Sequence, residues 1–323
     1  MVLPLNFTNF NNTQNMRIIF LGTPDFAVPS LEVLVKNNYD VVAVVTATDK
    51  KAGRGNKLQT SPVKDFAVAH NIPVLQPPNL KDPAFLEELK SYQADLQIVV
   101  AFRMLPEAVW NMPRLGTFNL HASLLPDYRG AAPINWAIIN GETETGVSTF
   151  FLKHAIDTGN IIFQEKEPIL PEDNVGTMYE KLKNKGGQLV LKTVQAIEQG
   201  EYPQLEQDLT RKTPKAPKLF KETGQIDWTK SSEQIHNLVR GLSPIPAAWT
   251  TLNEKHCKIY KTNLATPRLT EDVEDKQPGE FITDNKKYLY YKTGDGFIAI
   301  EELQIQGKKR MEVKSFLSGN KLI

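Results

Sequence analysis

The sequence predicts an α/β protein in which a parallel sheet with helices on both faces is followed by a smaller β-barrel. From residue 17 onward, short β-branched runs alternate with amphipathic segments, which is the pattern of strands joined by crossover helices. Beyond residue 222, short strands separated by turn residues predominate. The chain has 323 residues, about twice a typical domain of roughly 150, so we expect two domains.

The first domain, expected over residues 16–205, is predicted to have a Rossmann-like fold. Its strands are nearly continuous apolar runs, as expected where helices cover both faces of a sheet. We expect strands at 17–21, 41–46, 73–75, 96–101, 117–121, 147–152 and 161–163. Most of the expected helices begin near a proline, which a first helical turn tolerates because the missing N–H would be unpaired there. We expect helices at 29–36, 62–70, 83–92, 106–110, 132–139 and 177–199.

A second domain is expected over residues 222–323, after a basic linker at 206–221. The linker segment holds five basic residues and two prolines without apolar periodicity. For the second domain we expect a helix at 231–242 and strands at 248–252, 257–260, 280–282, 288–292 and 297–305. Closing these strands into an OB-like barrel would remove exposed strand edges. Residues 1–15 carry no charge and lack the features of a secretory signal, so we expect a disordered extension there.

The composition excludes several classes of protein. No apolar stretch approaches the roughly 18–20 residues of a membrane-spanning helix, so we expect no membrane contact. The single cysteine, Cys257, allows neither an intramolecular disulfide nor a cysteine-based zinc site, and it fits the cytoplasm. The net charge is +1, but residues 1–205 carry 18 Lys and Arg against 21 Asp and Glu, whereas residues 206–323 carry 20 against 16. The basic excess therefore lies in the C-terminal part.

Motifs for nucleotide and metal binding are incomplete. The first strand runs into Gly22-Thr23-Pro24-Asp25-Phe26, which lacks two of the three glycines of a dinucleotide-binding turn, and the sequence contains no Walker loop. Four histidines show no spacing typical of metal ligands, namely His70, His154, His236 and His256. We expect these histidines to be surface or structural residues, and we expect no bound metal.

Asn119 and His121 are two residues apart at the end of the strand expected at 117–121. In a strand this spacing places both side chains on one face, so an amide donor and an imidazole can converge on one reacting atom. Ligands in open parallel sheets bind beyond the carboxyl ends of the strands, where this pair lies. The alternative, that both side chains only hydrogen-bond a strand end, stays open on this spacing alone.

Asp157 stands in Ile156-Asp157-Thr158-Gly159-Asn160, a turn expected between two strands and therefore at an end of the sheet. A carboxylate beside an imidazole raises its basicity and fixes its orientation, so Asp157 is the expected partner of His121. The Asp-Thr-Gly motif also marks aspartic proteases, but those need two such carboxylates and the sequence has no second motif. As a lone motif, Asp157 is also compatible with an ordinary turn residue.

These motifs form an ordered set along the chain. The set consists of Asn119-Leu120-His121, Ser123-Leu124-Leu125-Pro126, Tyr128-Arg129-Gly130-Ala131-Ala132-Pro133-Ile134 and Asp157-Thr158-Gly159. It resembles the set found in the folate-dependent formyltransferases. Three further segments resemble the members of that family that act on methionyl initiator tRNA: 22–27, 52–55 with 61–64, and 226–228. The resemblance extends over roughly residues 16 to 320 and implies both expected domains.

The resemblance implies that 10-formyltetrahydrofolate donates its formyl group to the α-amino group of methionine on initiator tRNA, without a metal. Asn119 and His121 would stabilise the negative charge that develops on the formyl oxygen. Asp157 would hold His121 protonated and oriented while helping to remove the proton from the attacking nitrogen. The resemblance also implies that folate is contacted by one turn, made of Ser123, Leu124, Leu125 and Pro126.

The same resemblance implies that a basic segment, residues 49–64, contacts the acceptor stem of the tRNA. By itself, this segment would be interpreted as a solvated charge run. The residues expected to bind tRNA are Lys50, Lys51, Arg54 and Lys57. Arg54 stands between two glycines, where the backbone can bend toward nucleic acid. The basic linker and the C-terminal domain would extend this contact along the stem, and we expect the protein to act as a monomer.

Two other functions stay open from the sequence. One is folate-dependent formyl transfer to a small amine such as an amino sugar nucleotide, against which the basic segment 49–64 argues. The other is a noncatalytic RNA-binding protein that keeps the fold, in which Asn119, His121 and Asp157 could be replaced with effects on stability only. Supplying the formyl donor together with either class of substrate distinguishes these functions.

Overall fold

The computed structural model describes residues 16–52, 57–155, 157–264 and 275–322, without the side chains of Lys51, Ala52 and Lys57. The chain divides into two compact units. The first unit comprises Met1–Phe118 and Val194–Glu201, and the second comprises Asn119–Thr193 and Tyr202–Ile323. The extension expected at residues 1–15 lies outside the described residues.

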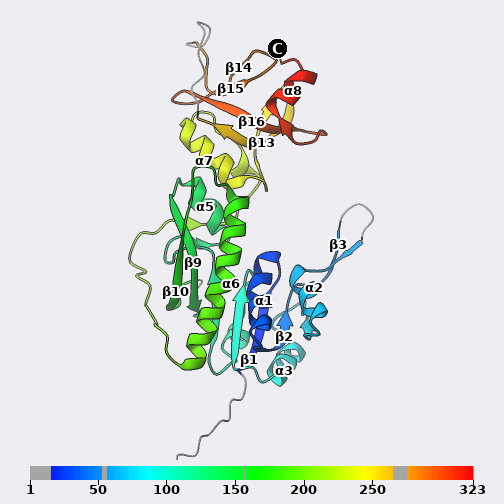
Figure 1. Ribbon diagram of the computed structural model, residues 1–323, viewed down its shortest axis with the longest axis vertical. Helices are drawn as coiled ribbons and strands as arrows, with labels where there is room; N and C mark the ends of the chain where they lie inside the picture. Colours follow the sequence, from blue (N-terminus) through cyan, green and yellow to red (C-terminus); the bar gives the residue numbers. More distant parts are fainter. Residues whose placement is uncertain (1–15, 53–56, 156, 265–274, 323) are drawn as a thin grey trace, which may run out of the picture. The chain divides into compact units, whose positions relative to one another are not determined.

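A seven-stranded sheet has the order β10-β9-β7-β6-β1-β2-β5, and Figure 1 labels its strands β10, β9, β1 and β2. Its strands are β1 (Arg17–Gly22), β2 (Asp40–Val45), β5 (Val74–Leu75), β6 (Leu96–Val100), β7 (Thr117–His121), β9 (Glu144–Phe151) and β10 (Ile161–Pro168). β1 pairs in parallel with β2 and β6, β2 pairs in parallel with β5, and β10 is antiparallel to β9. Every residue of β6 is buried, and all of them except Gln97 are apolar, as expected for a strand covered on both faces. The predicted α/β class is confirmed, with an antiparallel strand at one edge.

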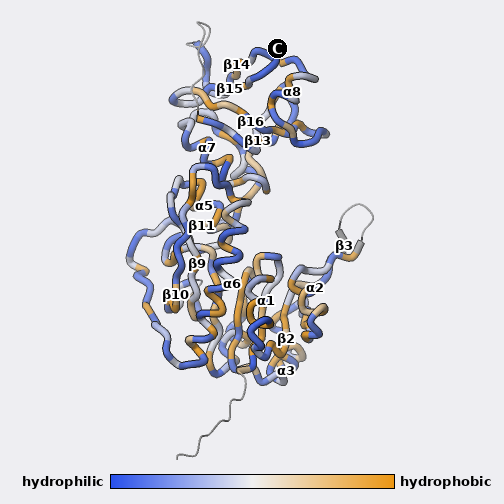
Figure 2. Tube along the Cα trace, in the orientation of Figure 1, coloured by the Kyte–Doolittle hydropathy of each residue, from blue (hydrophilic) through white to orange (hydrophobic). Residues whose placement is uncertain are grey.

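The helices of the first unit begin where proline and capping residues allow. They are α1 (Val28–Lys36), α2 (Pro62–Ala69), α3 (Pro83–Ser91) and α4 (Glu107–Trp110), with a 3₁₀ turn at Asp25–Ala27. α2 starts at Pro62, and the Ser61 hydroxyl accepts a hydrogen bond from the Lys64 N–H over 3.1 Å. The sheet beneath them is apolar, as the hydrophobic colouring of β2 in Figure 2 shows. Burial of these strands therefore accounts for the periodicity in the sequence.

Helix α6 (Val175–Gln199) fixes which way the side chains of β7 point. A Cβ atom on Gly186 of α6 would lie 2.6 Å from Leu120 Cδ2, so this part of the helix packs directly on Leu120. Side chains alternate along a strand. Because Leu120 faces α6, Asn119 and His121 face away from that helix, on one side of β7, as the spacing predicts.

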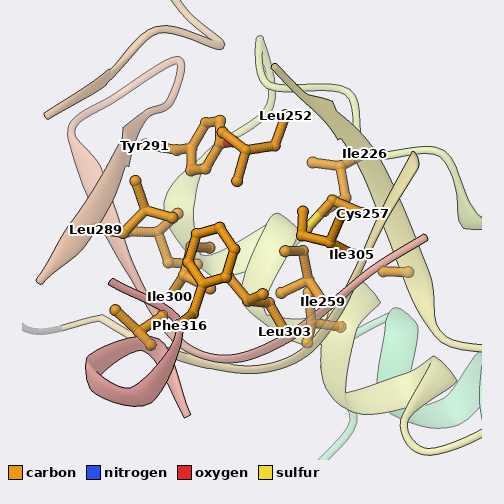
Figure 3. Close-up of a cluster of buried hydrophobic side chains, with 14 of the residues drawn as sticks. Ile226, Leu252, Cys257, Ile259, Leu289, Tyr291, Ile300, Leu303, Ile305 and Phe316 are labelled. Carbon is orange, nitrogen blue, oxygen red and sulfur yellow. The ribbon is translucent and has the colours of Figure 1, made fainter. Parts of the chain in front are cut away.

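The C-terminal part folds as a curled antiparallel sheet, a half-barrel, with two helices. The strands are β12 (Ala248–Leu252), β13 (Lys255–Asn263), β14 (Phe281–Thr283), β15 (Leu289–Lys292), β16 (Phe297–Ile305) and β17 (Met311–Glu312). Their order is β12-β13-β16-β15-β14, with β17 pairing to β16. The helices are α7 (Ser232–Leu242) and α8 (Val313–Gly319), of which α8 was not predicted. Side chains of α8, including Phe316, complete a buried apolar cluster with Leu303 and Tyr291 (Figure 3).

We expect His236 on α7 to make the stability of this part depend on pH. Burial, together with the nearby Arg240 guanidinium, lowers the pKa of His236 to about 4, and its Nδ1 lies 2.8 Å from the Thr262 hydroxyl. An unfolded histidine has a pKa of about 6.5. Between about pH 4 and 6.5 the folded state therefore binds fewer protons than the unfolded state. The contribution of His236 to the free energy of unfolding is therefore greatest above about pH 6.5, and it falls as the pH drops toward 4.

Urea denaturation of the wild-type protein and of His236→Gln between pH 4 and 8 tests this expectation. The variant should lose part of the pH dependence below about pH 6.5. The exposed His70, replaced in His70→Gln, provides the matched control and should leave the dependence as in the wild type. Equal pH slopes for the wild type and His236→Gln would contradict the assignment.

Candidate active site

Asn119 and His121 lie in the C-terminal half of β7, which stands between β6 and β9 in the sheet. Asn119 is half-buried, and in the described part of the chain its side chain makes no hydrogen bond to protein groups. His121 is 7% exposed. The Asn119 amide is therefore available to a ligand at the edge where open α/β sheets bind theirs.

The His121 ring is held by a backbone carbonyl. Its Nε2 lies 2.9 Å from the Tyr128 oxygen. A carbonyl can only accept a hydrogen bond, so Nε2 carries a proton and Nδ1 is the ring nitrogen left for a substrate. The sequence predicts Asp157 as the partner that orients His121. In the described residues the ring is instead oriented by Tyr128, because the backbone at that residue turns its carbonyl toward β7.

Tyr128 is itself fixed from several sides. Its backbone has φ 58°, in the left-handed region that non-glycine residues seldom adopt. Its N–H donates to the Pro214 oxygen over 2.8 Å, and its hydroxyl donates to the Glu142 carboxylate over 2.6 Å. Burial and this carboxylate raise the pKa of Tyr128, so the phenol stays protonated. These contacts keep the carbonyl of Tyr128 in place for His121.

Asp157 reaches the same loop by a different contact. It lies in the turn between β9 and β10, and its Oδ2 accepts a hydrogen bond from the Gly130 N–H over 3.2 Å. Gly130 belongs to the short strand β8 (Arg129–Gly130), which pairs in parallel with β11 (Lys215–Ala216). The loop that holds the His121 ring therefore also holds the Asp157 carboxylate. The structure brings the two side chains to one loop rather than to a direct hydrogen bond.

The turn predicted to contact folate, Ser123 to Pro126, is held by hydrogen bonds from the Ser123 and Ser148 side chains. Ser123 is fully buried, and its hydroxyl donates to the backbone carbonyl oxygen of Asp127 over 2.7 Å. The Ser148 hydroxyl donates to the Ser123 oxygen over 2.6 Å and accepts from the Leu125 N–H over 3.1 Å. Leu124 and Pro126 are half-buried, whereas Leu125 is buried. A folate contact at this turn, which stays a prediction, would therefore use Leu124 and Pro126, while Ser123 positions the turn.

The basic segment contains a β-hairpin that the sequence did not reveal. β3 (Lys50–Ala52) and β4 (Lys57–Gln59) pair antiparallel, and Lys50 is exposed. Lys64 forms an ion pair with Asp49 at 2.5 Å, and hydrogen bonds from Lys64 and Gln76 lower the pKa of Asp49. Arg54 and the side chains of Lys51 and Lys57 lie outside the described residues. The structure thus places the hairpin backbone and neutralises Lys64.

Sequence reasoning missed the backbone partners of the site. Tyr128 and Gly130 contribute a carbonyl and an N–H, which every residue of their type carries, so no side-chain pattern reveals them. Gly130 did carry one signal. Its φ is 130°, and a Cβ there would lie 2.3 Å from the Ala216 oxygen, so only glycine fits the close approach of β11.

Neither a metal cluster nor a membrane-spanning helix is present among the described residues. Residues 16–52, 57–155, 157–264 and 275–322 contain no group of three or more His, Cys, Asp or Glu side chains arranged to hold a metal ion. No helix in these ranges is long and apolar enough to span a membrane.

Together these features define an α/β protein in which one loop contacts the His121 imidazole and the Asp157 carboxylate, while the Asn119 amide shares a face of β7 with His121. The chain belongs to the formyl transferase family: the family model described as formyl transferase matches residues 16–194, and the model of the formyl transferase C-terminal domain matches residues 218–321. A methionyl-tRNA formyltransferase of Bacteroides fragilis is 51% identical over 309 residues, 95% of each chain. One of Phocaeicola vulgatus is 55% identical over 316 residues, covering 95% of this chain and 96% of the relative.

Solved structures show the same fold at lower identity. HypX from Aquifex aeolicus in complex with tetrahydrofolic acid is 18% identical with a TM-score of 0.61, and the match covers 94% of this chain and 47% of HypX. The sugar 3N-formyl transferase WlaRD, in the presence of dTDP and 5-N-formyl-THF, is 24% identical with a TM-score of 0.65, covering 91% and 99% of the two chains. These similarities support the fold.

Proposed function

We propose that the protein transfers the formyl group of 10-formyltetrahydrofolate to the α-amino group of methionine on initiator tRNA. The products are N-formylmethionyl-tRNA and tetrahydrofolate. The observation that carries this proposal is similarity at about half identity over 95% of the chain to relatives named methionyl-tRNA formyltransferase. We place the reaction in the cytoplasm, because a lone buried cysteine suits a reducing compartment. We also expect the protein to act as a monomer.

We assign the chemistry to three side chains. When the amine attacks the formyl carbon, a C–N bond forms and negative charge develops on the formyl oxygen. The Asn119 amide, which lacks a protein partner in the described residues, donates to that oxygen. The protonated His121 ring donates from Nδ1 while its Nε2 stays on the Tyr128 oxygen. Asp157, held by the Gly130 N–H, accepts the proton that the attacking nitrogen loses, directly or through water. The bond between the formyl carbon and the folate nitrogen then breaks, and this nitrogen leaves with the proton that Asp157 accepted, delivered directly or through water.

We propose that residues 16–205 form the catalytic domain, 206–221 the linker and 222–323 the tRNA-binding domain. The matches of the two family models to residues 16–194 and 218–321 support this division. The acceptor stem would be bound by four basic residues in or beside the β3–β4 hairpin, namely Lys50, Lys51, Arg54 and Lys57. The exposed position of Lys50 supports contacts to phosphate there.

Formyl transfer to charged initiator tRNA, measured with purified protein and 10-formyltetrahydrofolate, tests the function. Transfer to an amino sugar nucleotide but not to the tRNA would contradict it.

We expect Arg54→Ala to raise KM for the tRNA about tenfold with little change in kcat, and to reduce the salt slope of binding by about 1. The control Lys166→Ala removes an exposed cation that pairs with Glu144, and it should leave both quantities unchanged. An Arg54→Ala effect on kcat alone would contradict a binding role.

A further inference from the structure

We infer that Gln207, in the segment predicted as a linker, is the residue that positions Asp157 for formyl transfer; this inference rests on the proposed function. The two N–H bonds of the Gln207 amide are both used on the Asp157 turn. Nε2 donates to the backbone carbonyl oxygen of Asp157 over 2.9 Å and to that of Gly159 over 2.8 Å. One side chain thus spans the backbone on both sides of Thr158.

Backbone pairing places Gln207 opposite this turn. Leu205 pairs antiparallel with Ile161: the Ile161 N–H donates to the Leu205 oxygen over 2.8 Å, and the Leu205 N–H donates back over 2.9 Å. Continuing this register by two residues sets Gln207 against Gly159. The position of Gln207 is therefore fixed by the first residue of β10 rather than by its own side chain.

The turn is enclosed on its other side by backbone. A Cβ on Gly159 would lie 1.5 Å from the Phe151 oxygen, so the turn sits directly on the end of β9. Gln207 and the Phe151 carbonyl together leave the Asp157 backbone little freedom. The carboxylate can then keep its hydrogen bond to Gly130.

The backbone of Asp157 needs such support. Its φ is 54°, a left-handed conformation that costs free energy in a residue other than glycine and persists only where the surroundings impose it. Gln207 supplies two of the contacts that impose it. An unsupported turn would relax and carry the carboxylate away from the loop that holds His121.

Gln207 also buries a side-chain oxygen that has no hydrogen-bond partner among the described residues. The residue as a whole is 9% exposed, and the buried oxygen is Oε1. A buried acceptor without a partner destabilises a fold. Stability given up beside a candidate site is what a functional constraint on this position predicts.

A double-mutant cycle separates positioning from general stabilisation. Gln207→Leu should lower kcat for formyl transfer about 10–100-fold and leave KM for the tRNA within about threefold, because a misplacement of about 1 Å is enough for such a loss. In the Asp157→Asn background the same change should alter kcat less than about twofold, since Gln207 acts through Asp157. Gln304→Leu is the matched control: Gln304 also bonds two groups, Lys308 and Tyr260, and its loss should leave kcat unchanged.

A second variant keeps the test decisive if Gln207→Leu does not fold. Gln207→Glu keeps the size of the side chain but, when ionised, has no proton to donate to either carbonyl. Its kcat relative to the wild type should rise as the pH falls from 8 to 6, because the protonated carboxyl regains one donated bond and burial favours that form.

The outcomes separate the inference from the function. A wild-type protein that does not formylate methionyl-tRNA contradicts the proposed function, whatever the variants do. With an active wild type, the inference is overturned by any of three results: Gln207→Leu within twofold of the wild-type kcat, equal losses in both backgrounds of the cycle, or a Gln207→Glu to wild-type ratio that is constant with pH.

Discussion

Replacing His121 by alanine should lower kcat for formyl transfer about 10²–10³-fold, the size of effect seen when one donor to a developing oxyanion is removed. His121 offers Nδ1 to the reaction because Nε2 is bound to the Tyr128 oxygen. KM for the tRNA should stay within about threefold, because the residues expected to bind tRNA lie elsewhere in the chain. Steady-state kinetics with saturating formyl donor measure both quantities.

His70→Ala is the matched control for the loss of an imidazole. His70 also hydrogen-bonds a backbone carbonyl, that of Phe66 over 2.9 Å, but it lies exposed at the end of α2. Its kcat should equal that of the wild type. A His121→Ala variant that folds and turns over as fast as His70→Ala would exclude a catalytic role and favour the noncatalytic RNA-binding alternative.

Much of the fold could be predicted because strands buried on both faces of a sheet consist of nearly continuous apolar residues, which the sequence shows directly. The expected strand at 117–121 coincides with β7, and the expected helix at 177–199 differs from α6 by two residues at its start. The β3–β4 hairpin was missed because its residues are mostly polar and charged, and its strands are joined by backbone hydrogen bonds. α8 was missed because it has seven residues and no side-chain hydrogen bond at its N-cap.

The candidate site could be predicted only as far as side-chain periodicity reaches. Asn119 and His121 share a face of β7 because residues two apart in a strand must do so. The partner of the His121 ring could not be predicted, since it depends on a left-handed backbone at Tyr128 and on the Pro214 carbonyl far along the chain. Such contacts are properties of the fold and leave no spacing in the sequence.

The segment predicted as a linker shows the same limit from another side. Its prolines and cations indicate a connection, yet three of its residues brace the loops of the site. Gln207 holds the Asp157 turn, the Pro214 oxygen accepts from Tyr128, and the Ala216 oxygen accepts from the Ala132 N–H over 3.2 Å. The interactions use two backbone carbonyls and one amide. A segment without an apolar face can therefore still order a site, because hydrogen bonds rather than burial attach it.

Replacing Gly159 by alanine should damage stability and turnover together. The added Cβ would meet the Phe151 oxygen at 1.5 Å, a backbone atom at the end of β9 that cannot rotate away. Overpacking of this kind costs about 1–3 kcal/mol or more, and relief requires the turn to move. Because Asp157 is two residues away, the same movement displaces its carboxylate, and we expect kcat to fall about 100-fold.

Urea denaturation and steady-state kinetics of Gly159→Ala, beside Gly319→Ala, separate the two effects. Gly319 ends α8, and a Cβ there would have no heavy atom within 4 Å, so this control adds the same methyl group without a clash. It should match the wild type in unfolding free energy and in kcat. If Gly159→Ala were as stable and as active as Gly319→Ala, the turn would have to move freely without disturbing catalysis, and a fixed Asp157 would not be needed for formyl transfer.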